Sequence, residues 1–263
     1  EPFSLPDLKL PLELQVLQVD LGPLRLNGEE LLQSLQLRAD WRRAGLDIRE
    51  LRASRADMKL SLAGRLQPSG AWPLSLQGDA ALQIVDEQPW TLQFGVQGDV
   101  RERLGLNVDS AGYLDGNLSG QLQPLASGLP ATLKLTLDGF KASPDLPDSL
   151  RLVGFVLTAE GELDEGYRLL ASGRLAGEGG AVALQLNGLV NQAGARVDRA
   201  ELVANELQRV GLAGHLDWRE ALQGEASLQW QDFPWWRLYP QPEPPPVTLR
   251  TLTAQLQYDT GNY

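Results

Sequence analysis

Hydrophobic and polar residues alternate strictly in the stretch YLDGNLSGQLQPL, at residues 113–125. Leucine or glycine occupies every second position from 114 to 122, and Asp115, Asn117, Ser119 and Gln121 lie between them. Because successive side chains of a β-strand point to opposite faces, this pattern predicts a strand with one apolar face and one polar face. The glycines raise a question, since a packed core normally places bulk on its apolar face.

The same alternation recurs along the whole chain. It predicts strands over residues 8–16, 35–41, 60–66, 74–84, 90–100, 114–122, 133–139, 182–190, 212–218, 222–230 and 252–258. Successive strands are spaced irregularly, about 14 to 25 residues apart, so the chain is not a solenoid of fixed period. We expect about 12 to 15 strands in all, joined by turns such as residues 67–70, 164–166 and 178–180.

Two segments also fit short helices. Residues 28–36 place Leu31, Leu32 and Leu35 on one helical stripe, and residues 199–209 do the same with Val203 and Leu207. Both segments fit strands as well, and the strand interpretation agrees with the rest of the chain. The fold class expected from the pattern is therefore all-β.

The apolar face of so many strands must be covered, because a leucine removed from water contributes roughly 1.5 to 3 kcal/mol. A second sheet, closure into a barrel, or a ligand or lipid on an open, curled sheet would each cover it. A sandwich is the common solution. Recurrent glycine on the apolar face marks bends and close approaches, and we expect this face to curve and stay hollow at the glycines. Together with a lining of nearly uniform leucine, the glycines favour the open, curled sheet.

The amino-acid composition limits the kinds of site and partner that the chain can have. The chain has 263 residues, no cysteine and one histidine, so it offers no disulfide, no thiolate and no Cys/His zinc cluster. Its net charge of −11 argues against nucleic acid as a partner. It contains no run of 18 apolar residues and no export signal, and the alternation continues close to the last residue. We expect residues 1–263 to form a single elongated segment of a longer protein.

Acidic residues are the main candidates for catalysis, as the paired carboxylates of a hydrolase. Asp115, Asp138, Asp217 and Glu225 all fall on polar faces by parity, which indicates a solvated surface. His215 also falls on a polar face, without a neighbouring ligand pattern. We therefore expect no enzyme activity, no metal and no cofactor.

Two further features of the sequence each have two interpretations. The glycines of residues 177–180 resemble a phosphate loop, but no lysine follows them, and a hairpin turn fits better. The aromatic cluster of Trp230, Phe233, Trp235, Trp236 and Tyr239 fits a buried corner between two strands, or an apolar plug or lip at one end of a groove.

Repeated strands of the form Leu-x-Leu-x-Gly-x-Leu, the opening LPDLKLPLELQVLQVDLGPLRL (residues 5–26), the closing WQDFPWWRLYP (230–240) and LTAQLQY (252–258) together resemble the TamB family. These are inner-membrane-anchored periplasmic proteins of Gram-negative bacteria, related to the AsmA-like group and to bridge-like lipid transfer proteins. The proline-tryptophan element and the repeated strand pattern carry most of the likeness. The membrane anchor and the C-terminal part of the family lie outside this segment.

The resemblance implies an elongated, curled antiparallel or mixed sheet that forms a U-shaped hydrophobic groove. It implies that this groove carries phospholipid between the inner and outer membranes. The family is also linked to assembly of outer-membrane proteins with TamA, a barrel partner, which leaves open a scaffold whose strand edges capture other strands. On the first interpretation the groove residues are Leu60, Leu62, Leu66, Leu74, Leu76, Leu92, Phe94, Val96, Leu114, Leu118, Leu122, Leu133, Leu135, Leu137, Leu184, Leu186, Leu212, Leu216 and Leu228.

Overall fold

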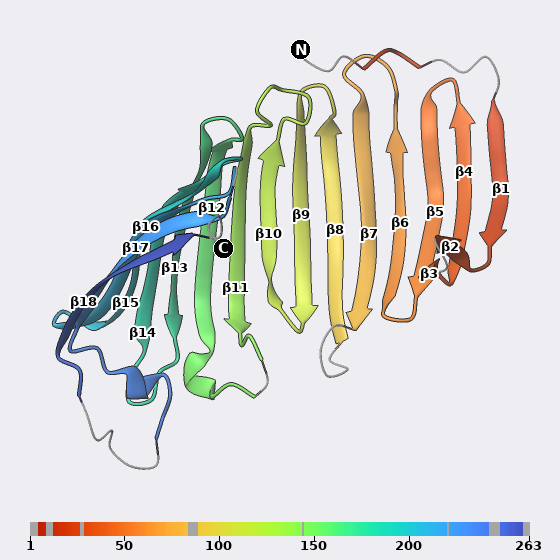
Figure 1. Cartoon of the computed structure of the whole chain (residues 1–263). Helices are drawn as coiled ribbons and strands as arrows, with labels where there is room; N and C mark the ends of the chain where they lie inside the picture. Colours follow the sequence, from red (N-terminus) through yellow and green to blue (C-terminus); the bar gives the residue numbers. More distant parts are fainter. Residues whose placement is uncertain are drawn as a thin grey trace. The chain divides into compact units, whose positions relative to one another are not determined.

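The computed structural model describes residues 5–8, 13–26, 29–83, 89–143, 145–219, 221–241 and 248–259. It consists almost entirely of antiparallel strands (Figure 1), and the described residues contain no α-helix and two short 3-10 helices. The chain forms two compact units, residues 1–130 and residues 131–263. The all-β prediction is confirmed.

Unit 1 is a sheet of eight antiparallel strands in the order β1-β4-β5-β6-β7-β8-β9-β10. A separate hairpin, β2 (Leu24–Leu26) with β3 (Glu29–Leu32), is the one excursion from consecutive order among its described residues. The eight strands are β1 (Leu14–Leu21), β4 (Ser34–Arg42), β5 (Gly45–Arg55), β6 (Met58–Leu66), β7 (Pro73–Gln83), β8 (Pro89–Asp99), β9 (Arg103–Gly112) and β10 (Asp115–Leu122).

Unit 2 contains eight strands that pair consecutively and antiparallel, each with the next along the chain. They are β11 (Ala131–Phe140), β12 (Leu152–Glu162), β13 (Gly166–Leu175), β14 (Val182–Val190), β15 (Gly194–Asn205), β16 (Gln208–Asp217), β17 (Gln223–Gln231) and β18 (Thr251–Asp259). The 3-10 helix η1 (Asp148–Leu150) precedes β12, and η2 (Trp235–Arg237) lies between β17 and β18.

Most predicted strands are confirmed within two or three residues. The first predicted strand, 8–16, is displaced: β1 runs from Leu14 to Leu21, and the described residues 8 and 13 are not in a strand. Residues 9–12 of this prediction lie outside the described part of the chain, as does residue 84 at the end of another. The helical alternatives are wrong: the described part of 28–36 contributes to β3 and β4, and 199–209 spans β15 and the start of β16. The described residues form 18 strands, more than the number expected, because the strands β2, β3, β5, β9, β12, β13 and β15 were not recognised.

Bulges explain several of the missed strands. The pairing register shifts in β5 between Ile48 and Leu51, in β12 between Val153 and Val156, and in β15 between Val197 and Ala200. Each bulge inserts a residue and reverses the parity of the positions beyond it. In the sequence, a bulged strand therefore shows two short stretches of alternation, and neither is as long as the strand itself.

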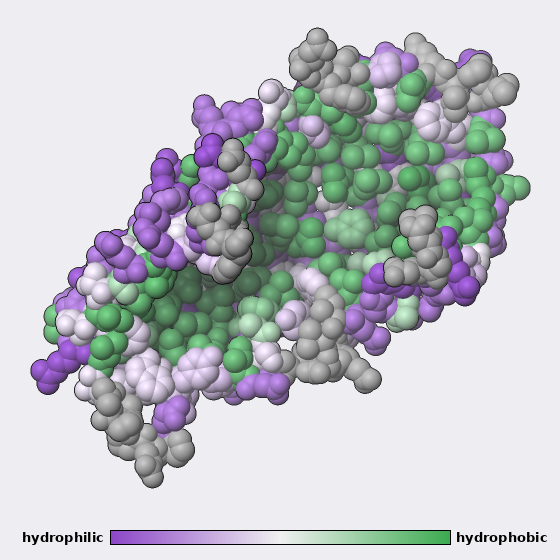
Figure 2. Space-filling view, in the orientation of Figure 1, coloured by the Kyte–Doolittle hydropathy of each residue, from purple (hydrophilic) through white to green (hydrophobic). Residues whose placement is uncertain are grey.

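Neither a sandwich nor a closed barrel forms within a unit. Each strand contacts mainly its hydrogen-bonded neighbours, and the strand order has two ends. Few hydrophobic side chains of the described residues are fully buried. Figure 2 shows hydrophobic side chains gathered on one face of the sheet. The apolar side chains of both units are therefore only half-buried, which is the open-sheet solution.

Candidate functional site

The apolar face of unit 2 is built from rows of residues that lie opposite one another on successive strands. Register places one apolar residue of every strand in each row. One row, here called the central row, is Leu135, Leu157, Ala171, Leu186, Ala200, Leu212, Leu228 and Ala254. The row beside it is Leu133, Ala159, Leu169, Gly188, Val197, Gly214, Ala226 and Leu256. Neither row is interrupted by a polar side chain.

Unit 1 has the same construction. One of its rows is Val19, Leu37, Leu51, Leu62, Gly78, Phe94, Val108 and Leu118, and a second is Val16, Ala39, Ile48, Gly64, Leu76, Val96, Leu106 and Gly120. The row through Leu60, Ala80 and Leu92 contains one polar residue, Ser110. Its hydroxyl accepts a hydrogen bond from Trp90 Nε1 at 2.7 Å and donates to the carbonyl oxygen of Leu114. The polar atom is thus satisfied within the protein.

With one exception, the predicted groove residues lie in these rows or in parallel rows on the same apolar faces. Leu114 lies in the turn that precedes β10, where its carbonyl oxygen accepts the Ser110 bond. The others lie on the apolar faces of β6, β7, β8, β10, β11, β14, β16 and β17. Whether they contact lipid remains a prediction.

The apolar residues of the unrecognised strands were not among the predicted groove residues. These include Leu51 of β5, Leu106 of β9, Leu157 of β12, Leu169 of β13 and Leu202 of β15. In β5, β12 and β15 the alternation is visible in the sequence if each side of the bulge is considered separately. In β9 it is visible without a break, because the pairing of this strand has no bulge. Register, which puts them in the same rows as the predicted residues, is not visible.

Glycines of the apolar face allow close strand approach but do not leave it hollow. A Cβ built at Gly78 would lie 2.4 Å from the carbonyl oxygen of Ser61 and 2.6 Å from the ring of Phe94. A Cβ at Gly64 would lie 2.3 Å from the carbonyl oxygen of Ser75, with the Leu76 side chain also within 3 Å. Large side chains of the next strand occupy the space. The expectation of a hollow at the glycines is wrong at these positions, whereas the expectation of close approach is confirmed.

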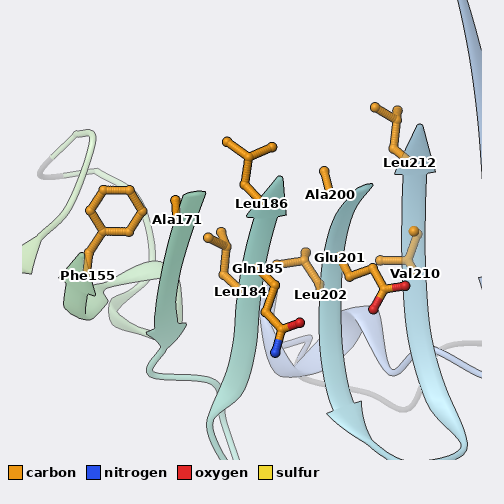
Figure 3. A pocket seen from close by; sticks show the side chains of 11 residues that line it. Phe155, Ala171, Leu184, Gln185, Leu186, Ala200, Glu201, Leu202, Val210 and Leu212 are labelled. Atoms are coloured by element: carbon orange, nitrogen blue, oxygen red, sulfur yellow. The ribbon is translucent and has the colours of Figure 1, made fainter. Parts of the chain in front are cut away.

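Two apolar cavities lie side by side on unit 2. The first, of about 480 Å³, is lined by side chains that include Phe155, Leu184, Leu186 and Leu202. Figure 3 shows the apolar and polar residues of these strands on opposite sides of the sheet, with Leu186 on one side and Gln185 on the other. The second cavity, of about 530 Å³, is lined by Val197, Leu216, Leu222 and Leu256 among others. Leu212 lines both cavities, which makes them neighbours on one apolar surface.

One end of the first cavity adjoins the best-packed part of the molecule. Phe233 and Leu238 are 3% and 8% exposed and pack with the fully buried Val182. Leu202 and Val210 touch this cluster and also line the cavity. The segment of residues 233–238, here called the aromatic corner, therefore bounds the cavity.

Hydrogen bonds fix the aromatic corner to the strand ends. Ser149 donates from its hydroxyl to the carbonyl oxygen of Leu238 at 2.7 Å, and the Glu178 amide donates to that of Arg237 at 2.7 Å. Trp230 packs edge-to-face on the Phe233 ring. The predicted buried corner is confirmed for Trp230, Phe233 and Trp235, whereas Tyr239 is exposed.

The candidate acidic residues lie on polar faces, as predicted. Asp115, Asp138 and Glu225 are exposed. His215, on β16, is also exposed. Asp217 accepts hydrogen bonds from Arg219, which lower the pKa of its carboxyl. Among the described residues, no group of three or more His, Cys, Asp or Glu side chains is arranged to hold a metal ion. Residues 177–180 form the turn between β13 and β14, as expected.

Within the described ranges, the structure contains no helix that is long and apolar enough to cross a membrane. No solved structure matches this one. A family model described as TamB, N-terminal domain, matches residues 2–243, which is most of the chain. The half-buried apolar rows and the consecutive antiparallel order agree with this match, and the chain belongs to the TamB family.

Proposed function

We propose that this chain is a periplasmic segment that binds phospholipid acyl chains on its apolar face and passes them along it, between the inner and outer membranes. The observation that supports the proposal is the continuity of the apolar rows across eight strands in each unit. The proposal assigns no catalytic step, cofactor or metal.

The size of the apolar face suits acyl chains. Eight strands about 4.8 Å apart give a row roughly 34 Å long. One leaflet of a bilayer is about 15 Å deep in hydrocarbon, so a row of this length accommodates two chains end to end. Burial of a 16-carbon chain contributes on the order of 12 kcal/mol at about 0.8 kcal/mol per CH₂. The apolar face is therefore long enough and apolar enough to hold a lipid tail.

The side chains of the apolar face suit movement of an acyl chain along it. Leucine, alanine and glycine dominate the central row and its neighbour, and these side chains offer no hydrogen bonds that would hold a chain in one register. The two cavities share Leu212, so an acyl chain passes between them without crossing a polar barrier. Such a lining supports sliding more than tight binding at one position.

Bound lipid is the direct test. We expect native mass spectrometry of the chain purified from bacteria to show bound phospholipid. Leu118→Asp in β10 and Leu135→Asp in β11 place a carboxylate in the apolar rows and should lower bound lipid and lipid transfer severalfold. Ser119→Asp and Thr132→Asp add the same charge to the polar faces of the same strands and serve as matched controls. Unchanged transfer in Leu118→Asp and Leu135→Asp would contradict the proposal.

An assembly scaffold is the second candidate, and one observation favours it. Strand β18 pairs with β17 alone among the described residues, and its Leu252, Leu256 and Tyr258 are 39%, 54% and 54% exposed. An exposed edge strand is a template for β-augmentation. On this proposal the edge captures outer-membrane protein strands in cooperation with a TamA-type barrel.

The two candidate functions predict different effects of blocking the edge of β18. Thr253→Pro removes a backbone donor from β18 and should abolish capture of unfolded barrel strands while leaving bound phospholipid unchanged. Loss of lipid with no effect on strand capture would count against the scaffold.

A further inference from the structure

Basic residues concentrate on three neighbouring strands of a chain that is otherwise acidic. Residues 38–65, which span β4, β5 and β6, contain eight arginine or lysine residues and four aspartate or glutamate residues, a net charge of +4. The whole chain carries −11, so the residues outside this segment carry −15. The basic residues are Arg38, Arg42, Arg43, Arg49, Arg52, Arg55, Lys59 and Arg65. The charge of this segment is thus opposite to that of its surroundings.

Register places this charge on one side of the sheet. Leu37, Leu51 and Leu62 are opposite one another in an apolar row, so Arg38, Arg52 and Ser61, each next to one of them, lie on the polar face. By the same parity Arg42, Lys59 and Arg65 also lie there, and Arg49, in the bulge of β5, reaches Asp40 on that face. We call the surface formed by Arg38, Arg42, Arg49, Arg52, Lys59 and Arg65 the basic patch.

The four acidic residues of the segment organise the patch without neutralising it. Asp40 is 3% exposed and forms ion pairs with Arg49 and, at 3.6 Å, with Arg42. The remaining ion pairs are Arg65 with Asp47, Arg38 and Arg52 with Glu50, and Arg55 with Asp57. A buried carboxylate that holds two guanidinium groups fixes their positions before any ligand arrives. The side chains of Arg42 and Arg49 are 63% and 52% exposed. Their guanidinium groups are therefore accessible to a binding partner.

Two cavities open beside the patch. One, of about 490 Å³, is lined by Arg42, Arg49 and Arg65 together with Leu66 and Leu74 of an apolar row. The other, of about 610 Å³, is lined by Arg49 and Arg52, by the carboxylates of Glu50, Asp79 and Asp109, and by further polar side chains. The first gathers three guanidinium groups near the ends of the strands, beside the carboxylates of Asp40 and Asp47.

We propose that the basic patch docks on the surface of a bilayer that contains anionic phospholipid. The partner follows from charge complementarity. Anionic headgroups in a fluid bilayer move toward basic side chains and away from the acidic remainder of the chain. A nucleic acid carries phosphates at fixed spacing and would bring them against that acidic remainder as well. This inference does not depend on acyl chains occupying the apolar face, because it concerns the opposite face of the sheet.

Vesicle binding tests the proposal. The chain is mixed with vesicles of phosphatidylcholine alone or of phosphatidylcholine with phosphatidylglycerol, and the bound fraction is measured by flotation. We expect a preference for the anionic vesicles that is lost in about 1 M salt, where the Debye length is about 3 Å. Each basic residue near an anionic surface strengthens association about fivefold. The triple variant Arg38→Gln, Arg52→Gln, Lys59→Gln should therefore bind anionic vesicles about a hundredfold more weakly.

A matched triple variant separates the patch from the total charge. Lys134→Gln, Arg168→Gln, Arg174→Gln removes the same charge from exposed positions of β11 and β13 and should bind like the unchanged chain. Circular dichroism of both variants checks the fold. Equal binding to the two kinds of vesicle, or equal loss in both variants, overturns the proposal. Preferential binding of an oligonucleotide over anionic vesicles, or a dimer that the patch variant dissociates, overturns it in favour of that partner.

Discussion

Gly78→Ala tests whether the glycines of the apolar face are required by strand geometry. The added Cβ would lie 2.4 Å from the carbonyl oxygen of Ser61, 2.6 Å from the Phe94 ring and 3.0 Å from Leu62. The ring of Phe94 can rotate away, but the carbonyl oxygen belongs to the backbone of β6, so the β6–β7 pair must separate locally. Overpacking of this kind costs typically 1 to 3 kcal/mol.

Gly95→Ala is the matched control. Gly95 lies on the neighbouring strand β8, on the polar face, and the nearest atom to a Cβ there is the Leu76 carbonyl oxygen at 3.9 Å. With no clash, alanine reduces the entropy of the unfolded chain and should stabilise by about 0.4 to 1 kcal/mol. The two substitutions add the same methyl group and are expected to change stability in opposite directions.

Urea unfolding followed by circular dichroism measures both effects. Gly78→Ala should lower the midpoint and Gly95→Ala should leave it unchanged or raise it, with similar denaturant slopes in both variants. The expected difference between the two is about 1.4 to 4 kcal/mol. Equal midpoints would refute the reasoning, because the carbonyl contact would then have no energetic consequence.

Other predictions concern the aromatic corner and the 3-10 helix η1. Phe233→Ala should destabilise the chain by about 3 to 5 kcal/mol through the cavity it leaves, whereas Tyr239→Ala, at a 49% exposed position, should change thermal stability little. Hydrogen bonds from Lys141 and then Arg151 lower the pKa of Asp148. Its stabilising effect is complete above the ordinary carboxyl pKa and is lost as pH falls through the lowered value. The difference in unfolding midpoint between the unchanged chain and Asp148→Asn should therefore vanish in strong acid.

Alternation sufficed to predict the fold class and most of the strands. In β10, the positions of Leu118 and Leu122 on the apolar face follow from parity alone, because the strand has no bulge. In β15 the register shifts between Val197 and Ala200, so parity assigns one half of the strand to the wrong face. Bulges depend on neighbouring strands and are not encoded in a short window of one strand.

The glycines were only half understood from the sequence. Their recurrence among leucines indicated bending or close approach, and the contact of Gly78 with the Ser61 carbonyl confirms it. Alternation does not show which residue faces each glycine on the next strand. Register places Phe94 opposite Gly78 and Leu76 opposite Gly64, and these side chains fill the space.

The packing of residues 233–238 also depended on distant residues. The sequence showed an aromatic cluster beside prolines, which fits a corner or a plug. Its partners include Leu150, Leu175 and Val182, which lie about 50 to 85 residues earlier in the chain and meet it because several strands of unit 2 end at the same edge. A local pattern cannot identify such partners.

An uncovered apolar face has a thermodynamic consequence. Leu212 and Leu216 remain 37% and 36% exposed although both lie in the apolar rows. A fully buried leucine contributes roughly 1.5 to 3 kcal/mol, so each such residue retains a substantial part of this free energy for whatever covers it. Hydrogen bonds between strands maintain the sheet without a second layer, and the remaining apolar surface can be covered by lipid or by other chains. A chain stripped of lipid should therefore self-associate through these rows, and phospholipid should suppress that association if it occupies the same face.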